Sequence, residues 1–130
     1  MTIRAIQTGN QVGPYSPAVV ATGSFVFVSG QGSIVDGQYR PGTVAEETKA
    51  ALDNLTDLVR RAGSRPDLVV QCRIFLSDIA DFAAVNEVYA EYFGEPYPAR
   101  TTVQAGALPL GVRVEIECVA AVVASDLSHD

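Results

Sequence analysis

Two strand-like segments near the C-terminal end each carry one side chain that could do chemistry. Arg100 lies in the run of residues 98–103, and Glu115 lies in the apolar run of residues 112–117. A planar guanidinium can hold a small anion, and a carboxylate beside it can act as a general acid or base. The one histidine, His129, belongs to the polar tail, so Arg100 and Glu115 are the best candidates for binding and hydrolysing a small anion.

Side-chain alternation along these two strands decides whether the pair can share a cleft. Successive side chains of a strand point to opposite faces, so Arg100 shares a face with Thr102, and Glu115 shares a face of its own strand with Glu117. If the two strands are neighbours, Arg100 and Glu115 border one cleft. The alternative is a cross-strand salt bridge at a subunit interface, because arginine and glutamate on strands often pair.

Two other segments could present polar groups to a ligand. Ser29 and Gly30 follow an apolar run, but the segment lacks the complete pattern of a phosphate-binding glycine loop. It is interpreted as a tight strand exit whose backbone N–H groups could still bind a carboxylate or a developing negative charge. Tyr15 lies in the turn of residues 13–17, where packing of the ring and a catalytic role both stay open.

Several enzyme classes are excluded by residue types. A Ser-His-Asp or Cys-His nucleophile needs a histidine in the body of the chain, and none is present there. Paired carboxylates for glycoside hydrolysis are not supported either, because Glu115 and Glu117 share one face of one strand and the chain has no tryptophan.

The composition fits one domain spanning residues 1–130, with 48% hydrophobic and 18% charged residues. The net charge of −6 and the presence of a single lysine, Lys49, argue against nucleic-acid binding, which depends on clustered basic residues. No apolar run approaches the roughly 20 residues that span a bilayer, and no apolar signal segment opens the sequence. A cytoplasmic protein without membrane association is expected.

The two cysteines, Cys72 and Cys118, each lie in an apolar strand-like run. A free cysteine in such a run usually packs as a small hydrophobic residue, so both are expected to be reduced core residues. Neither has a CxxC partner or a histidine neighbour, and no metal site is expected.

The N-terminal third is predicted to be β-rich. Residues 18–22 and 25–29 read as two strands joined in a hairpin at Gly23, and a short strand is expected near residues 3–6. Glycine and proline mark residues 30–42 as a loop.

Two amphipathic helices are predicted in the rest of the chain. Thr43 to Glu46 forms a capping box, and apolar residues at helical spacing continue to Gly63. Residues 69–76 read as a strand, and a second helix starts at about Asp78 or Asp81 and closes before Gly94. With the two C-terminal strands, the predicted order is β-β-α-β-α-β-β.

Two helices with one apolar stripe each can cover only one face of the resulting sheet. Phe25 and Phe27 alternate with Val26 and Val28, so this strand is apolar on both faces. An uncovered apolar face of this size indicates a partner surface. A homo-oligomer with sites in clefts between subunits is expected.

Taken together, the sequence resembles the RidA/YjgF family of reactive-intermediate (enamine/imine) deaminases. The similarity runs in order over nearly the whole chain. The matching segments are residues 13–16 (GPYS), 27–31 (FVSGQ), 52–55 (LDNL), 81–86 (DFAAVN), 98–103 (PARTTV) and 114–120 (VEIECVA).

The resemblance implies a chorismate-mutase-like α+β fold and a homotrimer with three sites at the subunit interfaces, without cofactor or metal. The family's substrate-carboxylate arginine corresponds to Arg100, its acidic residue near the attacking water to Glu115, and its tyrosine to Tyr15. Its serine-glycine strand exit corresponds to Ser29 and Gly30.

Two more positions are implied to line the substrate site. Asn86 corresponds to the family's asparagine near the site entrance. Thr102 stands two residues after the arginine, where many members have a cysteine, so thiol chemistry is excluded at this position.

The implied reaction is hydrolytic deamination of a 2-imino acid or its enamine tautomer, such as 2-iminopropionate or 2-aminoacrylate. Arg100 would hold the carboxylate and Glu115 the water that attacks C2, giving a 2-oxo acid and ammonia, while Tyr15 either donates a proton or walls the pocket. The alternatives are a non-catalytic sensor of small carboxylates and, from activities credited to the family, a nuclease or holdase.

Overall fold

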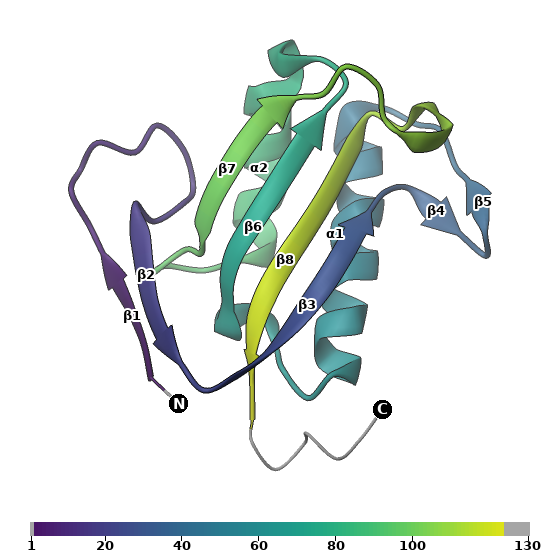
Figure 1. The fold of residues 1–130 in the computed structure, drawn as a ribbon. Helices are drawn as coiled ribbons and strands as arrows, with labels where there is room; N and C mark the ends of the chain where they lie inside the picture. The colour runs from purple at the N-terminus through teal and green to yellow at the C-terminus, as the bar shows by residue number, and fades with distance from the viewer. Residues whose placement is uncertain (1, 124–130) are drawn as a thin grey trace.

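A four-stranded mixed sheet, in the order β3-β8-β6-β7, forms the centre of the computed structural model, which describes residues 2–123 (Figure 1). β8 runs antiparallel to both β3 and β6, whereas β6 and β7 are parallel. Two parallel strands need a crossover connection, which α2 supplies between β6 and β7. The bounds are β3 Ser24–Gln31, β6 Val69–Leu76, α2 Phe82–Tyr92, β7 Ala99–Gln104 and β8 Val114–Val122.

The first helix, α1 (Val44–Arg61), begins at the predicted capping box. The Thr43 hydroxyl accepts a hydrogen bond from the Glu46 N–H at 3.1 Å, and the Thr43 N–H donates to the Glu46 carboxylate at 2.9 Å. Gly63 follows the helix with a φ of +85°, as expected for a helix C-terminus. The second helix is shorter than its widest prediction, because Asp78 caps a short 3₁₀ turn, Ile79–Asp81, before α2 begins.

The hydrophobic core lies between the two helices and one face of the sheet (Figure 1). Alternate residues of the central strands point into it, so Cys72 and Cys118 are both buried and both free, as predicted. The structure confirms the α+β fold with a mixed sheet and two helices on one face. The fully buried core side chains include Leu52, Leu55, Val59, Ile74, Val85, Tyr89, Val114 and Ile116.

The predicted hairpin between residues 18–22 and 25–29 is wrong. β2 (Ala18–Thr22) pairs with β1 (Thr2–Ile6) in a separate two-stranded sheet, and β3 pairs with β8. Gly23, with a φ of +125°, turns the chain so that β2 and β3 diverge (Figure 1). Each strand therefore pairs with a partner other than its sequence neighbour: β3 with the long apolar strand β8, and β2 with the five-residue strand β1.

The predicted loop of residues 30–42 contains a small hairpin. β4 (Ile34–Val35) and β5 (Gln38–Tyr39) pair across Asp36 and Gly37, whose φ values are 52° and 76°. Two consecutive positive φ values match the tight hairpin turn that an Asp-Gly pair favours. The loop prediction is corrected by this hairpin, which projects from the sheet edge beside β3 (Figure 1).

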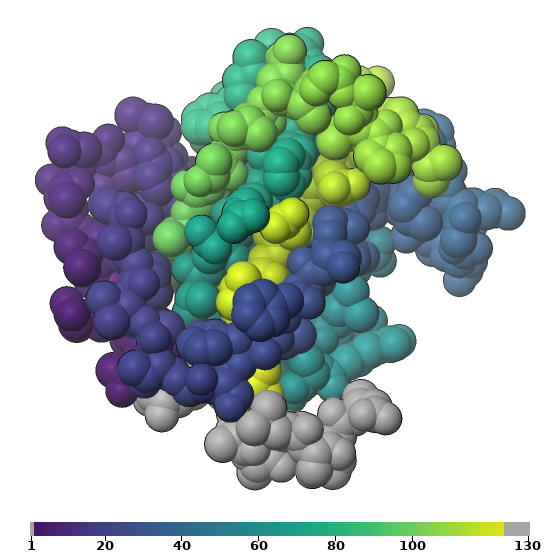
Figure 2. Space-filling model, viewed as in Figure 1, coloured from purple at the N-terminus to yellow at the C-terminus, as the bar shows by residue number. Residues whose placement is uncertain are grey.

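The second face of the sheet is open in the described part of the chain. Figure 2 views this face, where side chains of the four strands lie at the surface. Phe27 is 77% exposed and Val103 42% exposed there. The face is more polar than expected, because an ion pair of Arg73 and Glu117 also lies on it at 3.5 Å.

None of the helices within residues 2–123 is long and apolar enough to cross a membrane.

Candidate functional site

The Arg100 side chain extends from β7, the edge strand of the sheet, toward α2. Its Nε donates a hydrogen bond to the Thr102 hydroxyl at 2.9 Å, and its Nη2 donates to the Asn86 side-chain oxygen at 2.5 Å. Thr102 follows on the same face of β7, and Asn86 lies on the facing side of α2. The structure thus brings together three of the predicted site residues, with Asn86 and Thr102 both contacting the arginine itself.

Three aromatic rings surround the Arg100 guanidinium. Its central carbon lies 4.9 Å from the ring centroid of Tyr89, 5.4 Å from that of Phe82 and 5.6 Å from that of Tyr15. Phe82 and Tyr89 were read from the sequence only as part of the apolar stripe of the second helix. Phe82 precedes Asn86 by four residues and Tyr89 follows it by three, so all three lie on one helix face. This spacing is the feature of the sequence that could have placed the two rings beside the site.

No carboxylate of residues 2–123 contacts Arg100. Its Nη1 is buried and has no hydrogen-bond partner among these residues, and burial lowers the pKa of the guanidinium. Within residues 2–123 of one chain Arg100 and Glu115 form no salt bridge, and the alternative of such a bridge at a subunit interface stays a prediction. A half-buried cation with an unpaired N–H group is a position where an anion can bind.

A pocket of about 250 Å³ opens beside this arginine. Val12, Tyr15, Phe82 and Thr102 line it together with Arg100. The Tyr15 ring is half-buried, and its hydroxyl accepts a hydrogen bond from the Val12 backbone N–H at 3.1 Å. The hydroxyl oxygen is held in this way while its own proton stays available to a ligand.

Glu115, Ser29 and Gly30 meet on the open face of the sheet. A Cβ added at Gly30 would overlap the Glu115 carboxylate, so glycine leaves room for that side chain. The pairing of β3 with β8 is irregular between Val28 and Gln31, which frees the backbone at this point. Ser29 and Gly30 also border a pocket of about 530 Å³ on this face.

Arg100 and Glu115 do not share a cleft within one chain. β7 and β8 are not neighbours, because β6 lies between them. Arg100 stands next to the core residue Cys72 and faces the helices, whereas Glu115 stands next to Phe75 and faces the open side. The expected common cleft is corrected to two half-sites on opposite faces of one sheet.

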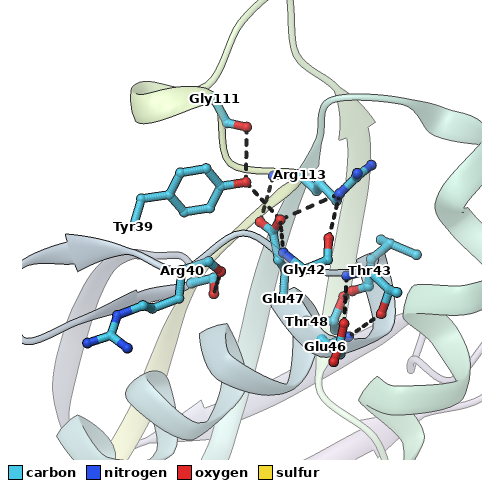
Figure 3. Close-up of polar contacts among 11 residues, drawn as sticks. Tyr39, Arg40, Gly42, Thr43, Glu46, Glu47, Thr48, Gly111 and Arg113 are labelled. Carbon is cyan, nitrogen blue, oxygen red and sulfur yellow. Dashed lines mark hydrogen bonds and ion pairs between the residues drawn. The ribbon is translucent and has the colours of Figure 1, made fainter.

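A polar cluster that the sequence did not reveal holds the segment before Glu115 (Figure 3). The fully buried Glu47 of α1 accepts hydrogen bonds from the Tyr39 hydroxyl at 2.7 Å, from the Gly42 N–H at 3.2 Å and from the Arg113 N–H at 3.0 Å. The Arg113 Nε donates to the Gly42 carbonyl at 2.8 Å. Glu47 therefore ties the β5 hairpin, the start of α1 and the entry to β8 together.

Metal ligation finds no support in the described residues, which contain no group of three or more His, Cys, Asp or Glu side chains able to hold an ion.

The structure is that of an α+β protein with a pocket lined by an arginine without a carboxylate partner in residues 2–123. The family model described as Endoribonuclease L-PSP matches residues 5–122. Mitochondrial protein mmf2 of Schizosaccharomyces pombe is 50% identical over 112 residues, covering 84% of this chain and 88% of that protein. The 2-iminobutanoate/2-iminopropanoate deaminase of Capra hircus is 45% identical over 111 residues, covering 84% and 80%.

Solved structures agree. The crystal structure of E. coli TdcF with bound serine superposes with a TM-score of 0.71 at 34% identity, covering 92% of this chain and 99% of that one. The chain belongs to the RidA/YjgF family.

Proposed function

We propose that this protein is a hydrolytic deaminase of 2-imino acids and their enamine tautomers, of the 2-iminobutanoate/2-iminopropanoate type. The observation that carries the proposal is the Arg100 guanidinium, half-buried among aromatic rings, without a carboxylate partner in the described chain and with Nη1 unpaired. The Capra hircus relative is named for this reaction, and the TdcF structure holds serine, a small amino acid.

The hydrogen-bond donors of Arg100 suit a carboxylate. A guanidinium has five N–H donors, of which Nε uses one on Thr102 and Nη2 uses one on Asn86. Both donors of Nη1 and the second of Nη2 are left. Two parallel charge-assisted bonds from these nitrogens would hold the substrate carboxylate and fix the position of C2.

Glu115 supplies the second half of the proposed site. We assign it the water that attacks C2, with Ser29 and the backbone of Gly30 beside it. Attack gives a carbinolamine, which takes up a proton on nitrogen, breaks its C–N bond and releases ammonia and a 2-oxo acid. Tyr15 is placed to donate that proton or to wall the pocket. Proton transfer of this kind contributes about 10²–10⁴-fold.

A substrate that touches both half-sites needs two chains. Since Arg100 and Glu115 face opposite sides of one sheet, the proposed site combines Arg100 of one subunit with Glu115 of another in a homotrimer. The exposed Phe27 on the open face supports such an interface. Sedimentation of the purified protein at several concentrations tests the assembly, and a monomer at every concentration would refute it.

The activity is tested with a 2-imino acid generated in situ by an amino-acid oxidase. Semicarbazide traps the imine, and the enzyme competes with the trap, so activity appears as a loss of the semicarbazone signal. We expect Arg100→Ala to abolish this loss and Arg61→Ala, which removes an exposed arginine of α1, to leave it unchanged. An unchanged signal with wild type, or full activity in Arg100→Ala, would overturn the proposal.

A carboxylate sensor without turnover is the second candidate, and one observation favours it. The arginine pocket is already formed in a single chain, without Glu115. Calorimetry with a 2-oxo acid, beside the turnover assay, separates the two functions: binding without acceleration supports the sensor.

We further propose a cytoplasmic location and no binding of nucleic acid. The free thiols Cys72 and Cys118 fit a reducing compartment, although mmf2 is named as mitochondrial. The net charge of −6 disfavours a phosphate backbone. Cell fractionation and a ribonuclease assay, with Arg100→Ala as a check for contamination, test the two points.

A further inference from the structure

Tyr89 combines the closest aromatic contact to Arg100 with complete burial of its own side chain. It is fully buried, and at 4.9 Å it is the nearest of the three rings to the guanidinium. Hydrogen bonds from Nε to Thr102 and from Nη2 to Asn86 already hold the Arg100 side chain, and the ring of Tyr89 adds a further contact to the guanidinium. A ring face holds a cation in place through its quadrupole, most strongly where water is excluded.

An aromatic face stabilises this cation without using its hydrogen-bond donors. A carboxylate partner would occupy the N–H groups of Arg100 and neutralise its charge, as Glu117 does with Arg73 on the open face. The ring of Tyr89 offers no acceptor lone pair in its face. Nη1 thus remains unpaired although it is buried.

Tyr89 is itself fixed and uncharged. Its ring packs on Phe93 with centroids 4.7 Å apart, and its hydroxyl has no hydrogen-bond partner among residues 2–123. Burial raises the pKa of the phenol well above its ordinary value, so no phenolate forms to pair with the guanidinium.

We propose that Tyr89 is a positioning residue, whose ring face orients the Arg100 guanidinium and keeps its donors open for a substrate carboxylate. This role rests on the proposed carboxylate-binding function of Arg100. Through Arg100, Tyr89 affects only the binding of the substrate carboxylate, which is held alike in the ground state and the transition state. Loss of the Tyr89 ring should therefore raise KM more than it lowers kcat.

Three variants test this role. Tyr89→Phe keeps the ring, and Tyr89→Leu removes it. Phe93→Leu is the matched control, because Phe93 is a buried aromatic that packs on Tyr89 and is not among the three rings in cation–π contact with Arg100. The readouts are KM and kcat for the imino acid, the Kd for 2-oxobutanoate, thermal stability, and the NMR signal of the Arg100 side-chain Nε–H, assigned by its loss in Arg100→Lys.

We expect Tyr89→Phe to match wild type within about twofold, and Tyr89→Leu to raise KM and Kd about tenfold, with kcat changed less, as fits the energy of a desolvated cation–π contact. Phe93→Leu should lower stability while KM and Kd stay near wild type. Tyr89→Leu with unchanged KM, Kd and Arg100 signal would overturn the role, as would an equal rise of KM and Kd in Phe93→Leu.

The outcome can be separated from failure of the proposed function. If wild type turns over no imine, the deaminase proposal fails. The positioning role is then decided by the Kd for 2-oxobutanoate and by the Arg100 signal, which is sharp in wild type and Tyr89→Phe and shifted in Tyr89→Leu if the role holds. If the signal stays in place in Tyr89→Leu, the role is refuted.

Discussion

Arg100 and Cys72 stand side by side on β7 and β6, and burial acts on them in opposite directions. It lowers the pKa of the guanidinium and raises the pKa of the thiol to about 12. Both shifts disfavour the charged form. Arginine begins from so high a pKa that it stays a cation, whereas Cys72 stays a neutral thiol although that cation lies on the neighbouring strand.

The raised pKa of the Cys72 thiol leads us to expect a loss of protein stability in alkaline solution. The pKa of Cys72 rises from 9.0 to about 12 on folding, so between these pH values the unfolded chain releases a proton that the folded chain keeps. The stabilisation is complete below pH 9 and is lost as the pH rises toward 12. From pH 8 to about 10.5 the group should cost about 2 kcal/mol of unfolding free energy. Denaturant titrations at several pH values measure this loss. If the unfolding free energy of Cys72→Ala fell as steeply with pH as that of wild type, the expectation would be contradicted.

A substitution at Gly30 is expected to lower activity without lowering stability. Gly30→Ala places a methyl group where the Glu115 carboxylate lies, so the carboxylate must move. We expect kcat for the imino acid to fall about 10–100-fold, with a melting temperature close to wild type because the displaced atoms are the end of a flexible side chain. Gly106→Ala is the control, since its Cβ would meet nothing within 4 Å. Equal activity in both variants would exclude this role of Gly30.

At the residue scale, the sequence indicated the candidate site residues, but it did not indicate which of them lie together in one chain. Arg100, Asn86 and Thr102 do assemble, because β6, α2 and β7 form one local crossover unit, and the bridge between Ser16 and Ala99 brings Tyr15 beside β7. Glu115 does not join them. The alternation of side chains tells which residues share a face of one strand, but it does not tell which strands are neighbours in the sheet. The aromatic surroundings of Arg100 looked like ordinary core positions.

At the scale of elements, local signals were sufficient where the partner is near in sequence. The capping box and Gly63 set the ends of α1, and β6 has its predicted bounds. Pairing was not predictable, because β3 chooses β8, about ninety residues away, over its sequence neighbour β2. The β4–β5 hairpin was hidden by the shortness of its two strands.

Glu47 links several of these elements, and its removal should destabilise the protein. In Glu47→Ala the N–H groups of Gly42 and Arg113 and the hydroxyl of Tyr39 lose their acceptor. We expect a loss of about 3 kcal/mol of unfolding free energy, since buried donors are left unpaired. Chemical denaturation measures it, with Glu46→Ala, which removes one side of the capping box at the surface, as the smaller effect. A larger loss in Glu46→Ala would contradict the assignment.

At the scale of the whole molecule, the open sheet face and the divided site point to the same assembly. The helices shield one face and leave Phe27 at the other, where Ser29, Gly30 and Glu115 also lie. Covering that face with a second copy would bury the phenylalanine and bring a carboxylate to the arginine pocket of its neighbour.

Mixing two inactive variants tests this arrangement. In the proposed trimer, Arg100→Ala and Glu115→Gln each disable every site of an assembly made from one variant alone. If each site combines Arg100 of one subunit with Glu115 of another, unfolding and refolding a 1:1 mixture should restore about one quarter of wild-type activity, because random assembly gives each half-site an even chance of being intact. Each variant refolded alone should stay inactive. No recovery in mixtures shown to contain both chains would overturn the site shared between subunits.

The placement of Arg100 and Glu115 on opposite sides of a single layer of strands has a kinetic consequence. Any reaction that needs both is closed to a newly synthesised, solitary polypeptide. Turnover per molecule would then climb steeply with protein abundance, decline gradually after dilution, and level off once every copy has found its neighbours.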